Sequence, residues 1–234
     1  PLRLVGSEMC IRDRAWSTMM RSMGGFSLIE VLLAISLGLL LLLAGSRVFI
    51  GALHSWRVQE VGARLQEDAR FVLQRMAGDI RMAGMFGCLR REVMSFPDAA
   101  TAQEFEQPFR LDRASDGGLR SLTLVSAQWG ELAGAPDWTL VTDCRTTAFV
   151  TGKRVTPGVG MFAVAVRQHI YRLNGRSLQL GSGGVSAVLV DNVGRFDVRQ
   201  DDDRVMLSLT LDDPGQRVRP QTYELTVVLR NAQQ

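Results

Sequence analysis

The sequence predicts an α+β fold in which one long N-terminal α-helix packs on an antiparallel β-sheet. Residues 26–46 are almost wholly apolar, residues 61–83 repeat apolar side chains with a helical period, and the chain beyond residue 119 holds short strand-like runs separated by turn residues. Because no proline occurs in residues 2–96, a single helix can run from Phe26 to about Met85.

The first part of this helix has the length and composition of a membrane span. The 21 residues from Phe26 to Ser46 carry one charged side chain, Glu30, and a helix of that length covers roughly 30 Å. A carboxylate at the centre of a bilayer costs about 2.5–3.5 kcal/mol, and somewhat less near the interface. We therefore expect residues 26–50 to form a transmembrane helix and Glu30 to have a partner.

The second part of the helix is amphipathic. Its apolar side chains recur at spacings of three, four or seven, with charged residues largely between them, so one face is expected to pack on a domain. These apolar positions are Val61, Leu65, Val72, Met76, Ile80 and Ala83. Glycine lowers helix stability, so bends or local melting are expected at the glycines of the helix, Gly45, Gly51, Gly62 and Gly78.

The rest of the chain is predicted to form strands. Residues 89–119 are expected to be irregular, with a helical turn around Ala99–Glu104. Asn174-Gly175 predicts a hairpin with a type I′ turn, which needs positive φ at both positions. Strands are expected at 119–126, 138–142, 161–173, 178–180, 187–199, 205–211 and 223–230.

A heptapeptide, Gly-Gly-Phe-Ser-Leu-Ile-Glu at residues 24–30, begins the apolar segment. It resembles the processing site of type IV prepilins, the precursors of pili and of the related secretion pseudopilins. The resemblance implies that a membrane peptidase cleaves after Gly25, that the new N-terminal Phe26 is N-methylated, and that Glu30 pairs with the N-terminal amine of the neighbouring subunit. It also implies the type IV pilin fold.

Other interpretations of the apolar segment remain. A secretory signal peptide would need a small-x-small cleavage site after the segment, and residues 42–47 offer only a poor one. In a lipoprotein signal a cysteine would stand where Ser46 lies. An ordinary single-pass anchor with an incidental Glu30 is the third alternative. The combination of Gly25, Phe26 and Glu30 favours a prepilin.

The resemblance divides the chain into three parts. Residues 1–25 would be a leader that is removed, and we interpret residues 1–14 as a sequencing-adapter artefact because Glu8–Arg14 resembles a translated transposon end. Residues 26–50 would be the transmembrane and assembly helix. Residues 51–234 would be the periplasmic domain, so the protein would cross the inner membrane of a Gram-negative bacterium once before it enters a pilus.

The residues at the end of the long helix resemble one particular family of pilins. Residues 65–71 and 79–88 are similar to the PilW family of minor pilins, as are Val190–Val193 and Leu229–Asn231. Such subunits prime pilus assembly near the tip and support adhesion and twitching motility. The implied partners are the prepilin peptidase, other minor pilins, the major pilin and a large tip adhesin. The main rival is a type II secretion minor pseudopilin of the J type.

Charge and cysteine content agree with a periplasmic subunit. Without residues 1–25 the chain has 23 basic and 22 acidic residues, which gives no support for binding of nucleic acid. The remaining cysteines are Cys88 and Cys144. If the N-terminus stays cytoplasmic, both lie in an oxidising compartment, and we expect them to form a disulfide.

Catalysis is not expected, and neither is a cofactor or a metal. The chain lacks a phosphate-binding loop and a nucleophile elbow, and Asp201–Asp203 and Asp212–Asp213 fall where acidic residues build turns. A calcium site at Asp201–Asp203 is a minor alternative. Another alternative is a tip module that binds sugar or DNA on Trp129 and Trp138, although such residues more often anchor a loop.

Overall fold

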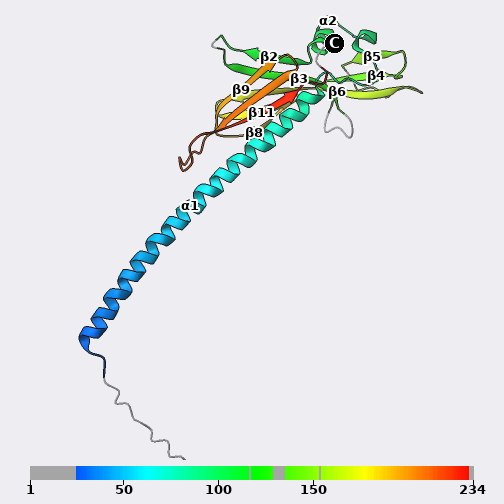
Figure 1. Ribbon diagram of the computed structural model, residues 1–234. Helices are drawn as coiled ribbons and strands as arrows, with labels where there is room; N and C mark the ends of the chain where they lie inside the picture. Colours follow the sequence, from blue (N-terminus) through cyan, green and yellow to red (C-terminus); the bar gives the residue numbers. More distant parts are fainter. Residues whose placement is uncertain (1–24, 116, 129–134, 153, 232–234) are drawn as a thin grey trace, which may run out of the picture. The chain divides into compact units, whose positions relative to one another are not determined.

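The structure is a computed structural model that describes residues 25–115, 117–128, 135–152 and 154–231 (Figure 1). The first 24 residues, which include most of the expected leader, and Trp129 lie outside the described residues. The chain divides into two compact units, residues 1–52 and 53–234, and each is described by itself below.

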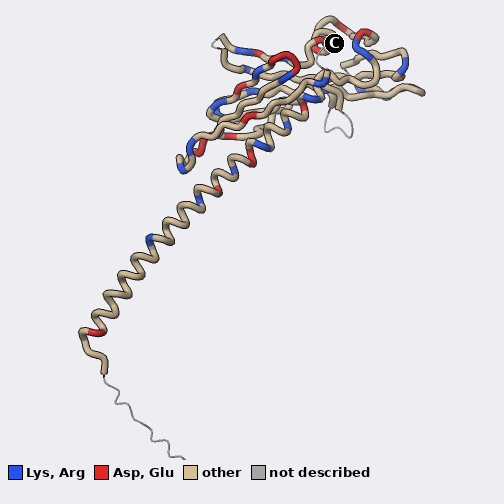
Figure 2. Tube along the Cα trace, in the orientation of Figure 1, with Lys and Arg blue, Asp and Glu red and all other residues tan. Residues whose placement is uncertain are grey.

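The long helix α1 extends from Leu28 to Met82 without interruption. The expected helix is therefore confirmed, although it begins two residues later and ends three residues earlier than the sequence suggested. None of the four glycines breaks its helical hydrogen bonding, because a glycine inside a long helix costs only about 1 kcal/mol relative to alanine. Glu30 is the only charged residue of the described chain before Arg47, as Figure 2 shows.

Two sheets follow the helix, where the sequence predicted one. The larger sheet has the order β1-β5-β4-β6-β3-β2, and β7 and β8 extend it beside β6. All its pairs are antiparallel except the two-residue parallel pair of β1 with β5. Its strands are β1 (Met94–Ser95), β2 (Phe109–Arg113), β3 (Leu119–Gln128), β4 (Trp138–Thr142), β5 (Ala148–Thr151), β6 (Phe162–Asn174), β7 (Ser177–Ser182) and β8 (Val185–Val190).

The smaller sheet contains β9 (Val193–Asp201), β10 (Arg204–Leu211) and β11 (Gln221–Val228), with β10 in the middle. The expected single strand 187–199 is thus wrong. It is divided between β8 and β9, which belong to different sheets, because Asn192 adopts a positive φ of 60° between them. Asparagine tolerates this left-handed conformation better than most residues.

The hairpin between β6 and β7 forms, but one residue later than predicted. Asn174 pairs with Ser177, so the two loop residues are Gly175 and Arg176. Gly175 has a φ of 59°, whereas Arg176 is not among the residues with positive φ. Glycine at the first loop position alone fits a type II′ turn, and the type I′ prediction is wrong.

The larger hydrophobic core lies between the second half of α1 and both sheets. Val72, Met76 and Ile80 of the helix are completely buried, as are Leu122 of the larger sheet and Leu207 of the smaller one. At about 1.5–3 kcal/mol for each fully buried apolar side chain, this contact holds the amphipathic half of α1 to the domain.

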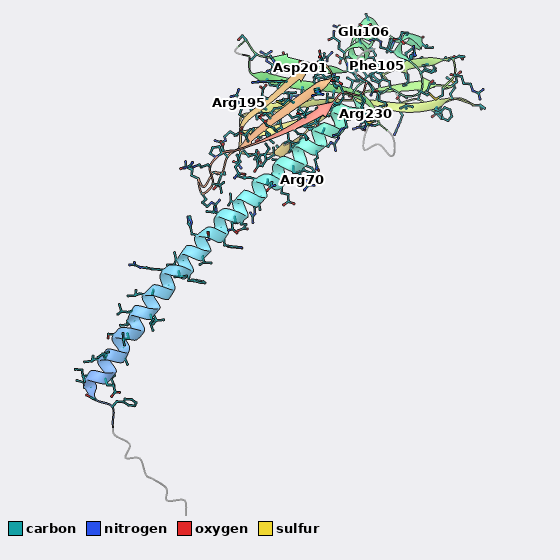
Figure 3. All side chains as sticks on the ribbon, viewed as in Figure 1. Arg70, Phe105, Glu106, Arg195, Asp201 and Arg230 are labelled. Atoms are coloured by element: carbon teal, nitrogen blue, oxygen red, sulfur yellow. A yellow bond between two sulfur atoms is a disulfide. The ribbon has the colours of Figure 1, made fainter. Side chains whose placement is uncertain are left out.

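A smaller core lies on the opposite face of the larger sheet. The helix α2 (Ala99–Glu106) and the 3₁₀ turn η1 (Arg91–Val93) lie on this side, and Figure 3 labels Phe105 and Glu106 of α2. The Phe105 ring lies 4.5 Å from the ring of Phe86 and 5.7 Å from that of Trp138, measured between centroids.

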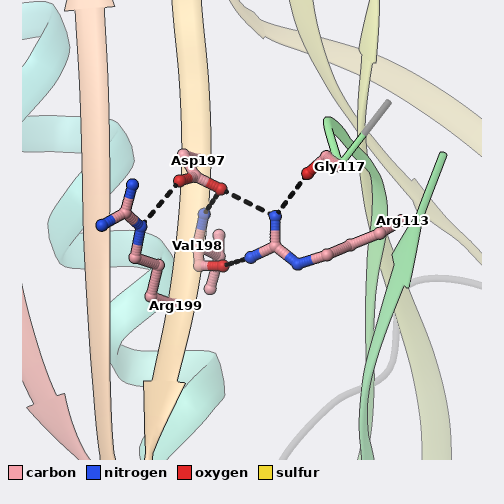
Figure 4. Close-up of polar contacts among 5 residues, drawn as sticks. All are labelled: Arg113, Gly117, Asp197, Val198 and Arg199. Atoms are coloured by element: carbon pink, nitrogen blue, oxygen red, sulfur yellow. Dashed lines mark hydrogen bonds and ion pairs between the residues drawn. The ribbon is translucent and has the colours of Figure 1, made fainter. Parts of the chain in front are cut away.

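Arg113 joins the two sheets (Figure 4). Its guanidinium donates from Nη1 to the carbonyl of Gly117 and to Oδ1 of Asp197, and from Nη2 to the carbonyl of Val198. Arg199 also donates to Asp197. Burial raises the pKa of Asp197, but the hydrogen bonds from both arginines outweigh this effect and hold it below its usual value.

Candidate functional site

The start of α1 contains the residues that the prepilin motif singles out. Gly25, Phe26 and Ser27 are not helical, and the helix begins when the carbonyl of Ser27 accepts hydrogen bonds from the N–H groups of Glu30 and Val31. The Phe26 side chain is 81% exposed. The peptide bond between Gly25 and Phe26 therefore lies in exposed, non-helical chain, the form that a peptidase needs.

Glu30 lies in the first turn of α1 and its side chain is exposed. Ser27 and Glu30 have the spacing of a capping box, and a carboxylate in the first turn interacts favourably with the helix dipole. Among the described residues, the Glu30 carboxylate has no hydrogen-bond or ion-pair partner. The Glu30 carboxylate, in the first turn of this apolar helix, can therefore pair with a charged or polar group of another molecule.

Gly25 is not required by the fold. A Cβ atom built at this position would meet nothing within 4 Å, and its φ is not in the positive range that favours glycine. If glycine is needed at this position, the need comes from a molecule that acts on the chain.

The helix beyond Glu30 exposes apolar side chains on all sides. Leu32, Leu39 and Leu42 are 61%, 56% and 68% exposed, and the Ser36 hydroxyl is satisfied inside the helix by donating to the Leu33 carbonyl at 2.8 Å. In the described part of the chain, α1 is the one helix that is long and apolar enough to cross a membrane. Such a surface needs lipid or protein around it.

The end of α1 brings together two segments that lie far apart in the sequence. The Asn231 side chain donates to the carbonyl of Ala83, the residue that follows α1, at 3.3 Å. Gly84 follows with a φ of 77°, and its N–H donates to the carbonyl of Val125 on β3. A Cβ atom on Gly84 would lie 3.2 Å from the Asn231 carbonyl and from Cγ of Pro108.

The Gly84→Ala substitution is expected to lower the free energy of unfolding by about 2 kcal/mol, because alanine is strained at a left-handed φ and its Cβ crowds Pro108 and Asn231. Gly78→Ala is the matched control: Gly78 is inside the helix with nothing within 4 Å, so this change should stabilise by about 0.5–1 kcal/mol. Denaturant unfolding measures both. Equal effects of the two substitutions would show that the fold does not require glycine at position 84.

Cys88 and Cys144 are joined by a disulfide, with their Cα atoms 5.3 Å apart. Cys144 lies in the turn between β4 and β5, with a φ of 56°. In this turn Oδ1 of Asp143 accepts the backbone N–H groups of residues 145, 146 and 147, each at 2.9 Å, and these bonds hold the pKa of Asp143 well below its usual value. The disulfide fastens the chain after α1 to the larger sheet.

A buried polar cluster connects α1 with β6. Oδ2 of Asp79 accepts a hydrogen bond from the Tyr171 hydroxyl, contacts Nδ1 of His169 at 3.1 Å and is 3.3 Å from Nε of Arg75. The other ring nitrogen of His169 is 3.1 Å from the amide nitrogen of Gln128. Burial raises the pKa of Tyr171, so its hydroxyl stays protonated and donates to Asp79.

This cluster contains a His–carboxylate pair, yet its position suits attachment of the helix better than catalysis. His169 is 4% exposed and Tyr171 is completely buried. The Asp79 carboxylate of this pair also accepts a hydrogen bond from the Tyr171 hydroxyl. The sequence does not reveal the cluster, because Asp79 looks like one of several charged residues on the solvent side of an amphipathic helix.

The Asp79→Ala substitution is expected to lower the free energy of unfolding by about 3 kcal/mol, because it leaves the buried Tyr171 hydroxyl and the His169 ring without an acceptor. Asp68→Ala, at an exposed position of the same helix, should change stability by no more than about 0.5 kcal/mol. Urea denaturation followed by circular dichroism compares them. A small effect of Asp79→Ala would show that the cluster does not hold the helix.

The two acidic runs singled out in the sequence, Asp201–Asp203 and Asp212–Asp213, form turns. Asp201 ends β9, and Asp202 has a φ of 51° in the tight turn to β10. Asp213 accepts hydrogen bonds from the backbone and the guanidinium of Arg217, while Asp212 pairs with Arg176 at 2.6 Å. In the described ranges no three His, Cys, Asp or Glu side chains lie close enough to hold a metal ion.

Trp138, the described member of the proposed aromatic platform, is half-buried and packs on Phe105 in the smaller core. It therefore anchors β4, in line with the alternative that such residues hold a loop. Trp129 and most of the Gly130–Pro136 loop lie outside the described residues.

Comparison of the chain with protein-family models, with curated proteins and with solved structures found no match. What the geometry establishes is a β-rich domain carried on a long N-terminal helix that could span a membrane, an architecture consistent with a pilin-like fold.

Proposed function

We propose that this chain is a minor pilin of a type IV pilus, similar to the PilW family. It would be anchored in the inner membrane with its domain in the periplasm, and then enter the fibre near its tip, where it primes assembly with other minor pilins and the major pilin. The observation that carries the proposal is the combination of an exposed Gly25–Phe26 bond with a lone Glu30 carboxylate at the start of an exposed apolar helix.

Glu30 supports assembly through charge neutralisation. Cleavage after Gly25 would create an ammonium group on Phe26, and an ammonium and a carboxylate are each costly in lipid but neutralise one another when they pair. Phe26 and Glu30 of one chain lie at the same end of α1, so each subunit would offer one group to each neighbour. The prepilin peptidase is then the first partner of the chain.

The domain supports a structural role rather than a catalytic one. Its buried ionisable cluster binds the helix to β6, the acidic runs at residues 201–203 and 212–213 form turns, and its disulfide fastens the chain after the helix to the larger sheet. In this proposal the domain presents surfaces to other subunits and to a tip adhesin, and a cytoplasmic ATPase elsewhere supplies the energy.

The Gly25→Val substitution is expected to abolish cleavage without disturbing the fold, because the peptidase must accommodate residue 25 whereas a Cβ there meets nothing. The measurement is mass spectrometry of the protein extracted from membranes. Wild-type chain should begin at N-methylated Phe26, and Gly25→Val should retain residues before 26.

Gly45→Ala is the control for this experiment. A Cβ on Gly45 would also meet nothing within 4 Å, but this residue lies well inside the apolar helix, so processing should be normal. A wild-type N-terminus upstream of Gly25 in cells with an active peptidase would defeat the proposal. Recovery of mature chain from a secretion pseudopilus, and not from sheared pili, would move the function to protein export.

A further inference from the structure

The tip of the β6–β7 hairpin contains a chemically reactive dipeptide, Asn174-Gly175, which occurs once in the sequence. Asparagine followed by glycine is reactive because the backbone nitrogen of the second residue can attack the side-chain amide of the first and close a five-membered ring. A side chain on the second residue hinders this attack, and glycine has none. The proposed function does not use this dipeptide.

Both reacting groups of the dipeptide are accessible. Asn174 and Gly175 are exposed, and a Cβ atom built on Gly175 would meet nothing within 4 Å. Within the described ranges, neither the Asn174 carboxamide nor the Gly175 N–H makes a hydrogen bond. The electrophilic carbon and the nucleophilic nitrogen are therefore both unshielded.

The strand conformation of Asn174 opposes the reaction, because closing the ring requires a rotation about its ψ angle. This residue is the last of β6, and its pairing with Ser177 is the last of the ladder with β7, so only one pair has to open. The end of a hairpin is among the parts of a fold that open most easily. The bonds that the Arg176 carbonyl and guanidinium make with Val193 and Asp212 lie beyond Gly175 and can remain intact.

The other two asparagines of the chain are restrained. Asn192 is followed by the β-branched Val193, and the Val193 N–H, which would be the attacking group, donates to the Arg176 carbonyl at 2.8 Å. The side-chain amide of Asn231 donates to the Ala83 carbonyl. Both residues are therefore internal controls for Asn174.

We propose that Asn174 is a site of spontaneous deamidation in the folded protein. The Gly175 nitrogen attacks Cγ of Asn174 and loses its proton, and the side-chain nitrogen leaves as ammonia, which closes a succinimide ring. Water then opens the ring at either carbonyl and leaves aspartate or isoaspartate at position 174. Water is the only co-reactant, and nothing is oxidised or reduced. The inference is independent of pilus assembly.

The product carries a new carboxylate at the tip of the hairpin. Arg172 lies two residues earlier on the same face of β6 and is exposed. Its guanidinium has no hydrogen-bond or ion-pair partner in the part of the chain that the structure describes, so it can pair with the new carboxylate. Because released ammonia is lost to solvent, the modified fraction increases with the age of the chain.

The test uses the full-length chain, purified from membranes and incubated near neutral pH in water labelled with heavy oxygen. The label enters only a carboxyl group that forms during the incubation, which excludes modification during later digestion. Mass spectrometry then measures the labelled fraction at each of the three asparagines. This fraction should be at least about tenfold higher at Asn174 than at Asn192 or Asn231, because only Asn174 is followed by glycine.

Two further measurements test the mechanism. Fragmentation of the labelled peptide should show both aspartate and isoaspartate at position 174, because the ring opens at either carbonyl. The rate in the native chain should be no more than about tenfold below the rate in urea, because only the terminal pair of the ladder has to open. Asn174→Gln keeps a carboxamide at the tip but cannot form the five-membered ring, so it should give no labelled product there.

Three results would overturn the proposal. The first is a labelled fraction at Asn174 no higher than at Asn192 and Asn231. The second is a product that contains aspartate alone, which would exclude the succinimide ring. The third is modification in urea without modification of the native chain, which would show that the hairpin protects Asn174.

Discussion

Replacing Glu30 by glutamine is expected to leave cleavage after Gly25 intact and to remove the subunit from the fibre. Glutamine keeps the size of the side chain, and the first turn of the helix is held by backbone hydrogen bonds to the Ser27 carbonyl, so the start of the helix is preserved. What is lost is the negative charge opposite a neighbour's ammonium. An uncompensated charge in lipid costs about 2.5–3.5 kcal/mol, which corresponds to roughly a hundredfold loss of incorporation.

Glu30→Ala should give the same loss of incorporation, because the effect depends on the charge and not on helix capping. Glu67→Gln is the control, since Glu67 is an exposed carboxylate of the same helix far beyond the apolar segment. The measurement is the ratio of subunit in sheared fibres to processed subunit in membranes. If Glu30→Gln enters fibres at the wild-type ratio, Glu30 does not direct assembly.

The two halves of α1 can be predicted from the sequence for different reasons. The apolar half is recognisable from composition alone, because a run of that length with so little charge is typical of a membrane-spanning helix. The amphipathic half is recognisable from periodicity, and the buried positions Leu65, Val72, Met76 and Ile80 follow the predicted stripe. The stripe cannot reveal the role of Asp79, since its partners on β6 lie 90 residues or more along the chain.

The strands that the sequence does not predict are short or charged. The sequence Phe-Arg-Leu-Asp-Arg of β2 has three charges in five residues and pairs only because β3 lies beside it. The division of residues 187–199 between two sheets depends on the left-handed conformation of Asn192, which the strand propensity of the residues on either side does not reveal. Local strand propensity predicts a strand poorly where the neighbouring strand determines whether it forms.

The motif at the end of α1 shows how a family resemblance and a packing requirement can coincide. In the sequence, Gly84 belongs both to the run that resembles PilW and to an ordinary helix end. In the structure its lack of a Cβ lets Asn231 and Pro108 approach the helix terminus. The C-terminal Leu229–Asn231 segment, a separate part of the resemblance, forms the other side of the same contact.

Replacing both Cys88 and Cys144 by serine is expected to lower the free energy of unfolding of the domain by about 4 kcal/mol. The two cysteines are 56 residues apart, and opening a loop of that length restores chain entropy to the unfolded state. For a domain of this size the melting temperature should fall by roughly 10 °C. Serine at position 144 has the same backbone strain at a left-handed φ as cysteine. The difference in stability between the wild-type chain and the double variant therefore measures the contribution of the covalent bond. A reductant should lower the melting temperature of the wild-type chain by a similar amount and leave that of the double variant unchanged. If the wild-type chain melts at the same temperature with and without reductant, the disulfide does not stabilise the domain.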